Sequence, residues 1–356
     1  MMKQVLILFG GVSSEYAVSL RSARAVIDHI DTSRWSVTTV GITEDGRWYL
    51  YTGSSDRIEN GSWCTDEAHL TPAVLSPDRS VHGLIVFSSE GVRTQRIDVV
   101  FPVLHGKNGE DGTMQGFLQL AGIPFVGCDA LSSAVSMDKA MTNTIADHIG
   151  LPQAKWLGTT AAQYAKDGET IRAHAAAYLG FPLFVKPANA GSSVGVTKVA
   201  SPDALDDAMQ KAFAQDSKVV LEEGIDGKEV ECAVLGNDDL YAPMVGEIVP
   251  CNDFYDYDAE YIADESELHI PARISRDTFD EVRDAACRIF RALGCSGLSR
   301  CDFFVRRSDG KVLFNEINTI PGFTSISMYA KMLVAAGMEY GEIVEKLLTL
   351  ALEKRS

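Results

Sequence analysis

The chain contains 356 residues, of which 46% are hydrophobic and 23% are charged, so it is long enough to form two or three domains with cores of their own. Its formal net charge is −17 and it contains no Lys/Arg-rich run, which argues against a nucleic-acid-binding protein with its usual basic patch. Seven scattered cysteines without a CxxC pair, and a first apolar stretch too short to span a membrane, predict a cytoplasmic protein with reduced thiols.

The first third of the chain predicts strands that alternate with a helix. Residues 5–9 form a continuous apolar run, which is typical of a strand buried on both faces. A helical pattern follows to about residue 26, and residues 37–42 and 97–104 read as further strands. This βαβ order predicts a parallel sheet with helices on its faces, and therefore the α/β class.

The pattern changes at about residue 128. Residues 130–149 predict one helix, and the elements expected after it are short strands at 183–187, 219–223, 230–235, 301–305 and 312–318 and a final helix at 340–352. Residues 249–267 are polar, aromatic and acidic, with little periodicity. A loop of that length inside a compact domain is usually functional, and often a lid.

A glycine pair, Gly10-Gly11, separates the first strand from the first helix. A helix N-terminus in this position can bind an anion, but the absence of a GxGxxG motif argues against a dinucleotide site. A tight turn in which Ser13 caps the helix is an equally good interpretation. Glu15, in the first turn, either compensates the helix dipole or binds a substrate ammonium group.

Two further glycine-rich segments are candidate ligand loops. Residues 190–195, close in sequence to Lys186, could cradle phosphates, although a simple glycine-rich hairpin is the commoner interpretation and no Walker A motif occurs. His105 begins a charged loop after a buried strand, on the side of an open α/β sheet where ligands usually bind. A lone histidine is nevertheless more often structural.

Two late strands carry alternating polar residues. Arg300 and Asp302 share one face of the first strand, and Glu316 and Asn318 share one face of the second. If the strands are neighbours, their oxygens come together as ligands suited to Mg²⁺ bridged to ATP phosphates. Either strand alone favours a solvated polar face, whereas the pair favours a metal site. Gly322, in the Pro-Gly turn that follows, is either a backbone oxyanion donor or part of an ordinary turn.

Taken together and in this order, these segments resemble the D-alanine–D-alanine ligase family. The likeness covers nearly the whole chain and rests on the segments FGGVSSEYAVSL, FPVLHGKNGEDGTMQG, MDKAMT, FVKPANAGSSVGVTKV, LEEGIDGKEVE, GLSRCDFF and NEINTIPGFTS. The SSEY segment and several flanking stretches resemble most the D-alanine–D-serine ligases of the vancomycin-resistance type.

The resemblance implies three domains and a homodimer. An N-terminal α/β domain for substrate binding is expected over residues 1–127, and a central ATP-grasp domain of α+β type over residues 128–221. A C-terminal ATP-grasp catalytic domain is expected over residues 222–356, with a lid loop at about 249–267. The lid departs from the family pattern because Glu260 stands where a lysine usually precedes Tyr261, which removes a positive charge from the phosphate side of the site.

The resemblance also implies the roles of individual residues. Those expected to contact ATP are Lys139, Lys186, Ser193, Glu222, Glu223 and Glu229. Those expected to hold two Mg²⁺ ions, which Mn²⁺ can replace, are Asp302, Glu316 and Asn318. The residues expected at the D-alanine subsites are Glu15, His105, Ser327 and Met328. Arg300 and the Gly322 N–H are expected to stabilise the oxyanion, and Glu15, Ser192 and Tyr261 to close the lid.

The implied activity is ATP-dependent joining of two D-alanine molecules through an acyl phosphate, for peptidoglycan precursor synthesis. The alternative is a D-alanine–D-serine ligase that confers vancomycin resistance. Met328 favours D-alanine if it lines the second subsite, because burying an unpaired hydroxyl costs about 1–3 kcal/mol. D-Lactate is disfavoured because residues 249–261 contain no histidine. The missing GxGxxG motif argues against a dinucleotide-dependent oxidoreductase, and the intact metal-ligand set against a non-catalytic binding protein.

Overall fold

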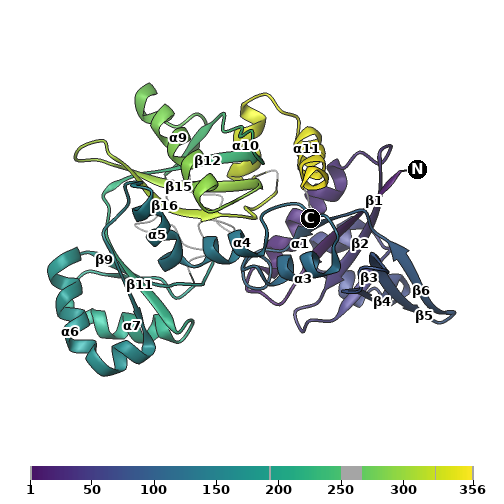
Figure 1. Ribbon diagram of the computed structural model, residues 1–356, viewed down its shortest axis with the longest axis horizontal. Helices are drawn as coiled ribbons and strands as arrows, with labels where there is room; N and C mark the ends of the chain where they lie inside the picture. Colours follow the sequence, from purple (N-terminus) through teal and green to yellow (C-terminus); the bar gives the residue numbers. More distant parts are fainter. Residues whose placement is uncertain (1, 192–193, 250–266, 325, 355–356) are drawn as a thin grey trace.

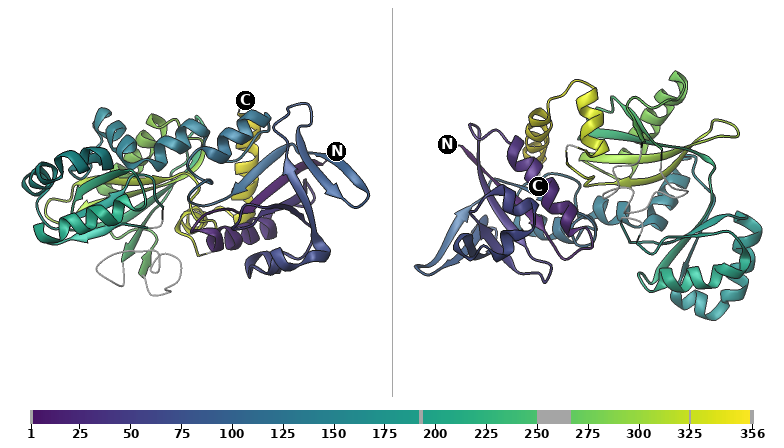
Figure 2. Two further views of the ribbon diagram at one scale, coloured as in Figure 1. Left: turned by 90° about the horizontal axis from the view of Figure 1, so that it is seen from below. Right: turned by 180° about the vertical axis from the view of Figure 1, so that it is seen from behind.

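The structure is a computed structural model that describes residues 2–191, 194–249, 267–324 and 326–354 (Figure 1). It is of the mixed α/β class expected from the sequence, with three β-sheets and helices packed against them. The sheets follow one another along the molecule, and the two views of Figure 2 show the N-terminal sheet at the end opposite α6 (Ala161–Leu179) and α7 (Leu205–Phe213). No helix in the described ranges is both long enough and apolar enough to cross a membrane.

The N-terminal sheet has seven strands in the order β6-β5-β4-β3-β2-β1-β7. Its strands are β1 (Lys3–Gly10), β2 (Trp35–Ile42), β3 (Trp48–Tyr51), β4 (Leu70–Leu75), β5 (Gly83–Ser88), β6 (Gly91–Arg96) and β7 (Val99–Val103). Only β2, β1 and β7 run parallel, while the other four join by antiparallel pairing. The expected parallel sheet is thus confirmed for the three strands at one end, and the antiparallel strands at the other end correct it.

Burial explains why the outer strands were not expected. β1 has an apolar core that is fully buried from Val5 to Phe9, whereas nearly every residue of β6 is exposed or half-buried and polar. An edge strand of this kind carries no apolar run in the sequence. The helices beside the sheet are α1 (Tyr16–His29), α2 (Ser55–Glu59) and α3 (Thr113–Ala121), with 3₁₀ turns at Ser62–Thr65 and Glu67–His69.

The single helix expected over residues 130–149 is wrong, because two helices, α4 (Ala130–Met137) and α5 (Lys139–His148), meet at Asp138. Asp138 has an extended backbone with φ −82° and ψ 99°. Its carboxylate accepts the N–H groups of Ala140 and Met141, each at 3.1 Å, and so caps α5. The cap starts a new helix at Lys139 and directs that residue toward the neighbouring sheets.

The central sheet is antiparallel, with the order β10-β9-β11-β8. Its strands are β8 (Trp156–Thr160), β9 (Leu183–Pro187), β10 (Thr197–Val199) and β11 (Lys218–Glu223), and α6 (Ala161–Leu179), α7 (Leu205–Phe213) and a 3₁₀ turn at Pro202–Ala204 accompany them. β9 and β10 form the two sides of a hairpin around the glycine-rich segment, as expected.

The C-terminal sheet has the order β14-β13-β12-β15-β16 and is also antiparallel. Its elements are β12 (Gly227–Gly236), β13 (Val245–Val249), β14 (Glu267–His269), α9 (Arg276–Ala292), β15 (Gly297–Arg306), β16 (Val312–Asn318), α10 (Met328–Ala335) and α11 (Tyr340–Glu353). Leu347 and Leu348 of α11 share one hydrophobic cluster with Val5 and Ile7 of β1. The last helix, α11, therefore packs against both the C-terminal and the N-terminal sheet (Figure 1).

Candidate active site

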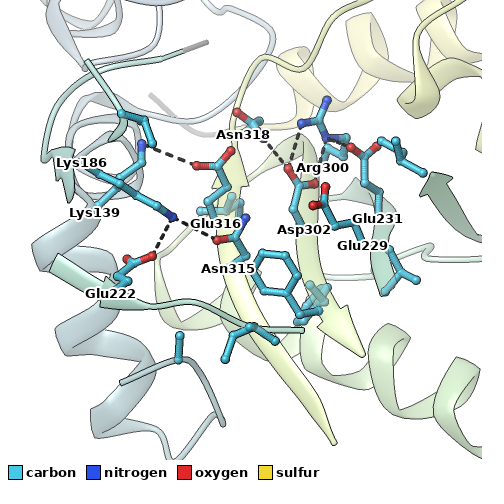
Figure 3. A pocket seen from close by; sticks show the side chains of 18 of the residues that line it. Lys139, Lys186, Glu222, Glu229, Glu231, Arg300, Asp302, Asn315, Glu316 and Asn318 are labelled. Carbon is cyan, nitrogen blue, oxygen red and sulfur yellow. Dashed lines mark hydrogen bonds and ion pairs between the residues drawn. The ribbon is translucent and has the colours of Figure 1, made fainter. Parts of the chain in front are cut away.

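A cavity of about 810 Å³ lies where the three sheets approach one another. It is lined by side chains of the central and C-terminal sheets, some of which Figure 3 shows, and by Glu15, Gly106 and Glu110 from the segments that follow β1 and β7. The expected site residues that line it are Glu15, Lys139, Lys186, Glu222, Glu223, Glu229, Arg300, Asp302, Glu316, Asn318 and Gly322. Residues from position 15 to position 322 thus converge on one space.

The two polar strand faces expected from the sequence are direct neighbours. β15 and β16 pair antiparallel, with Asp302 opposite Glu316 and Arg300 opposite Asn318. The Asn318 amide donates to Asp302 Oδ2 at 3.1 Å. Two carboxylates and one amide oxygen therefore belong to a single patch, and hard oxygen donors of this kind are what Mg²⁺ prefers.

Two lysines pair with carboxylates that line the cavity (Figure 3). Lys139 Nζ lies 3.5 Å from Glu316 Oε2, and Lys186 Nζ lies 2.6 Å from Glu222 Oε2. Burial disfavours the charged form of Glu316, but Lys139 and Lys186 outweigh it and lower the pKa of that carboxyl. In the same way burial opposes the charge of Lys186, and Glu222 and Glu316 raise its pKa above the usual value. Lys186 therefore stays protonated, and both lysines face the cavity, where an anion could bind.

Arg300 lies between two buried carboxylates. Its Nε and Nη2 contact Asp302 Oδ1 and Oδ2, both at 2.8 Å, which is a bidentate pair. Its Nε also lies 3.2 Å from Glu231 Oε1 on the neighbouring strand β12. Glu231 was not among the expected site residues. Glu231 ends the family segment LEEGIDGKEVE and alternates with Glu229 along the strand, but the register of β12 against β15 could not be read from the sequence.

Glu229 is a buried carboxyl whose negative charge the nearby Lys186 offsets only in part. Burial, together with the nearby Asp302 carboxylate, raises the pKa of Glu229 from 4.5 to about 7. A carboxyl with this pKa carries a proton for part of the neutral range. It can therefore act as a hydrogen-bond donor or acceptor toward a bound hydroxyl group.

A second group of titratable residues lies at the N-terminal side. Ligand atoms of Glu15, His105 and Glu110 come within 4.8 Å of one another, and all three side chains are buried. His105 Nδ1 donates to the Ile320 carbonyl at 2.9 Å, and its Nε2 lies 2.9 Å from Ser22 Oγ. Burial opposes the charge of His105, but Glu110 and Glu15 raise its pKa. Glu110 was also missed, although it lies in the charged loop that begins at His105.

Glu15 links this group to the glycine-rich segment. A Cβ atom on Gly106 would lie 2.9 Å from Glu15 Oε1, and a Cβ on Gly191 only 2.5 Å from the same oxygen. Both contacts are closer than a side-chain carbon allows. The carboxylate therefore lies against the backbone of two glycines, one in the N-terminal part and one in the hairpin between β9 and β10.

The start of the hairpin is fixed by α5. The Lys139 N–H donates to the Ala188 carbonyl at 2.9 Å, and Lys139 Nζ donates to the Ala190 carbonyl at 2.9 Å. Asp216 accepts the Asn189 N–H at 2.8 Å, and Lys218 pairs with the helix cap Asp138. Lys139 and the glycine-rich segment are thereby held as one unit.

Comparison with known proteins decides the family. The N-terminal part of the D-ala D-ala ligases matches residues 4–128, and their C-terminal part matches residues 145–349. The chain belongs to the D-alanine–D-alanine ligase family. The resemblance drawn from the sequence motifs is therefore confirmed, and with it membership of a family of ligases.

Individual members of the D-alanine–D-alanine ligase family align over the whole chain. A D-alanine–D-alanine ligase from Acetivibrio thermocellus is 47% identical, with 99% of this chain and 96% of the relative covered. The crystal structure of the VanG D-Ala:D-Ser ligase from Enterococcus faecalis superimposes with a TM-score of 0.89 at 44% identity, covering 99% of this chain and 100% of that one. The D-alanine-D-alanine ligase from Coxiella burnetii gives a TM-score of 0.84 at 31% identity, covering 99% and 95%.

Three of the residues expected at the substrate subsites are described but do not line the cavity. His105 is buried behind it, against Ile320. Ser327 Oγ accepts the Thr324 N–H at 3.1 Å, within its own turn. Met328 is buried, and its Cε lies so close to Gly246 on β13 that a Cβ there would be 2.2 Å away. Its thioether thus packs in the core, and the expected role in the second subsite remains a prediction.

The remaining expected residues, Ser192, Ser193 and Tyr261, lie outside the described residues, as does most of the lid expected at 249–267. The same holds for Glu260, which departs from the family pattern.

Proposed function

We propose that this chain is an ATP-dependent ligase that joins two D-alanine molecules to D-alanyl-D-alanine, for peptidoglycan precursor synthesis. The observation that carries the proposal is the meeting of Lys139, Lys186 and Arg300 with Asp302 and Glu316 in one cavity. Cations and hard oxygen ligands on opposite walls suit a nucleotide triphosphate with its metal. The names of the relatives then supply the substrate class.

The chemistry requires activation, because a carboxylate oxygen is a poor leaving group. In the proposed reaction the first D-alanine carboxylate attacks the γ-phosphorus of ATP, which yields an acyl phosphate and ADP. The amine of the second D-alanine then attacks the acyl carbon and inorganic phosphate leaves. Lys139 and Lys186 offset the charge on the phosphates, and Arg300 and the Gly322 N–H stabilise the oxyanion at the acyl carbon.

The ligands for the metal would be Asp302, Glu316 and Asn318. Their oxygens lie on two paired strands and match the preference of Mg²⁺, and of Mn²⁺ in its place, for hard donors. Bound ions neutralise phosphate charge during the transfer. The Asn318 amide lies 3.1 Å from Asp302 Oδ2, which supports this fit because donors from both strands meet on one patch.

The adenine and ribose of ATP would lie at the other end of the cavity, against Glu222, Glu223 and Glu229. Glu222 is held by Lys186 and by the Asn143 amide at 3.0 Å, so that it presents a fixed acceptor. The first D-alanine would bind near Glu15 and His105, where the buried negative charge suits an ammonium group. Ser327 is proposed for the carboxylate of the second D-alanine, and Ser192, Ser193 and Tyr261 for closure over the nucleotide.

We also propose the domain division at residues 1–127, 128–221 and 222–356. Its second boundary falls within β11, and α4 and α5 of the proposed central domain also contact β16 of the C-terminal sheet. A cytoplasmic location and a homodimer follow from the family resemblance. Sedimentation at several protein concentrations tests the dimer, for which a concentration-independent monomer is the contrary result.

A second candidate function is D-alanine–D-serine ligation, favoured by the 44% identity to the VanG D-Ala:D-Ser ligase. We propose D-alanine as the main second substrate, because the relatives named D-alanine–D-alanine ligase are equally similar, at 43–47% identity. Product analysis with equal concentrations of D-alanine and D-serine distinguishes the two. A dominant D-alanyl-D-serine product would replace the first proposal by the second.

The direct test of the main proposal is ADP release in the presence of ATP, Mg²⁺ and D-alanine. The proposal predicts a rate that rises with D-alanine concentration, with one dipeptide formed for each ADP. A reaction with L-alanine at the same concentration is the control. ADP release that does not respond to D-alanine would overturn the assignment.

A further inference from the structure

We propose that Glu231 is a positioning residue for Arg300, which it holds in place when a divalent cation draws Asp302 away. The inference rests on the proposed function, since it gives Asp302 the role of metal ligand and Arg300 that of oxyanion donor. It adds a residue to the site that the sequence motifs did not identify.

The geometry places Glu231 and Asp302 on either side of one guanidinium group (Figure 3). β12 and β15 pair antiparallel with Glu231 opposite Asp302, and Ala233 opposite Arg300. Arg300 Nε lies 2.8 Å from Asp302 Oδ1 and 3.2 Å from Glu231 Oε1. The side chain of Glu231 is only 6% exposed and that of Arg300 only 11%. All three charges are thus largely removed from water.

Asp302 faces two competing demands. A bidentate pair with Arg300 uses both carboxylate oxygens, and a divalent cation at the same carboxylate needs at least one of them. Cation binding therefore weakens the Arg300–Asp302 pair. A buried guanidinium that loses a carboxylate partner is costly, and the cost would appear as weaker metal binding.

Glu231 reduces that cost. Its carboxylate keeps an ion pair on Arg300 Nε while Asp302 turns toward the cation, and it holds the guanidinium beside the cavity. The role of Glu231 is thus to make Asp302 available without releasing Arg300.

The test is direct binding of Mn²⁺ to the full chain with ADP, measured from the electron paramagnetic resonance signal of free Mn²⁺. Glu231→Gln keeps the shape and removes the charge, so Arg300 holds Asp302 more strongly. We expect about tenfold weaker Mn²⁺ binding, the lower end of the usual effect of residues that orient metal ligands. The Mg²⁺ concentration for half-maximal ADP release should rise by a similar factor. Mn²⁺ binding within twofold of the wild-type protein would overturn the proposal.

Asp66→Asn is the matched control. Asp66 is a buried carboxylate that pairs with Arg57 and His69 in the N-terminal part of the chain, away from the cavity. Its loss should lower the thermal stability while leaving Mn²⁺ affinity unchanged, which separates a positioning effect from general destabilisation. If Asp66→Asn weakens Mn²⁺ binding as much as Glu231→Gln does, the proposal is wrong.

Glu231→Asp keeps the negative charge but shortens the side chain by one methylene group, which moves the carboxylate away from Arg300. It should bind Mn²⁺ with an affinity between those of the wild-type protein and Glu231→Gln, and it carries the test if the Gln variant does not fold. A wild-type protein that releases no ADP with D-alanine yet binds Mn²⁺ would contradict the proposed function alone. A wild-type protein that binds no Mn²⁺ would contradict the role of Glu231 as well.

Discussion

Asp302 and Glu316 lie directly opposite each other on the antiparallel strands β15 and β16, and each carboxylate is paired with a different cation. Asp302 is held by Arg300, and Glu316 by Lys139 at 3.5 Å. The two carboxylates are therefore neighbours in the sheet, while cations contact them from opposite sides. This arrangement connects the nucleotide side of the cavity with the side where the oxyanion would form.

Removing the charge of Glu316 should disable metal-dependent turnover. We expect Glu316→Gln to reduce D-alanine-dependent ADP release by roughly 100-fold, because a metal ligand and the partner of Lys139 are both lost. Circular dichroism should show an unchanged fold. Glu353→Gln, an exposed change on α11, is the control. Wild-type turnover in Glu316→Gln would rule out its role as a ligand.

Arg300 should affect the rate and not merely substrate binding. Loss of an oxyanion donor typically reduces kcat by about 10²–10³, and Arg300→Ala should lose at least that much. Arg300→Lys retains the charge but cannot form the bidentate pair with Asp302, so it should recover only part of the activity. Steady-state kinetics check both variants. A change confined to KM would contradict the role of Arg300 at the reacting carbon.

Glu229 predicts a pH dependence of stability. Its pKa is about 7 in the folded chain against an ordinary 4.5, so the folded chain holds this proton more tightly than the unfolded chain does. Below about pH 4.5 the Glu229 carboxyl is protonated in both states and does not change the free energy of unfolding. Between about pH 4.5 and pH 7 it lowers that free energy progressively, by at most about 3 kcal/mol.

Glu229→Gln removes this cost. Relative to the wild-type protein, the variant should gain thermal stability as the pH rises from about 5 to 8, even if it binds ATP less well. The measurement is thermal unfolding with EDTA and without nucleotide. A stability difference that stays constant over this range would show that Glu229 is not perturbed.

The position of the Glu15 carboxylate should require glycine at residue 191. A methyl group on Gly191 would meet Glu15 Oε1 at 2.5 Å, so Gly191→Ala must displace the carboxylate or the hairpin. We expect KM for D-alanine to rise roughly tenfold, equivalent to about 1.4 kcal/mol. Gly116→Ala is the control, since its added carbon meets Ala130 at an ordinary 3.8 Å inside a helix. Equal KM values in both variants would contradict the contact.

The sequence predicted the two neighbouring polar strands well because alternation along a strand determines which side chains share a face. The polar faces around Asp302 and Glu316 each lie between apolar residues, and only neighbouring strands could bury them together. The apolar run of β1 and the amphipathic pattern of α11 were equally direct signals. Local patterns of this kind predict most of the buried strands and amphipathic helices.

The sequence could not predict contacts that depend on register or on the approach of distant segments. Glu231 meets Arg300 only because β12 pairs with β15 in one particular register. Met328 packs against Gly246 through the position of α10 on β13, which no local pattern specifies. The sequence did not reveal the break between α4 and α5 at Asp138, because the residues on both sides of it are good helix formers. The Asp138 carboxylate caps α5 there.

The central claim is that the carboxylate of the first D-alanine is activated as an acyl phosphate, and isotope transfer tests it most directly. D-Alanine labelled with ¹⁸O in its carboxylate is incubated with ATP and Mg²⁺, and the inorganic phosphate is analysed by mass spectrometry. The account predicts one labelled oxygen in the phosphate for each dipeptide formed, because the acyl–oxygen bond breaks when the second amine attacks. Dipeptide formation with unlabelled phosphate would contradict it.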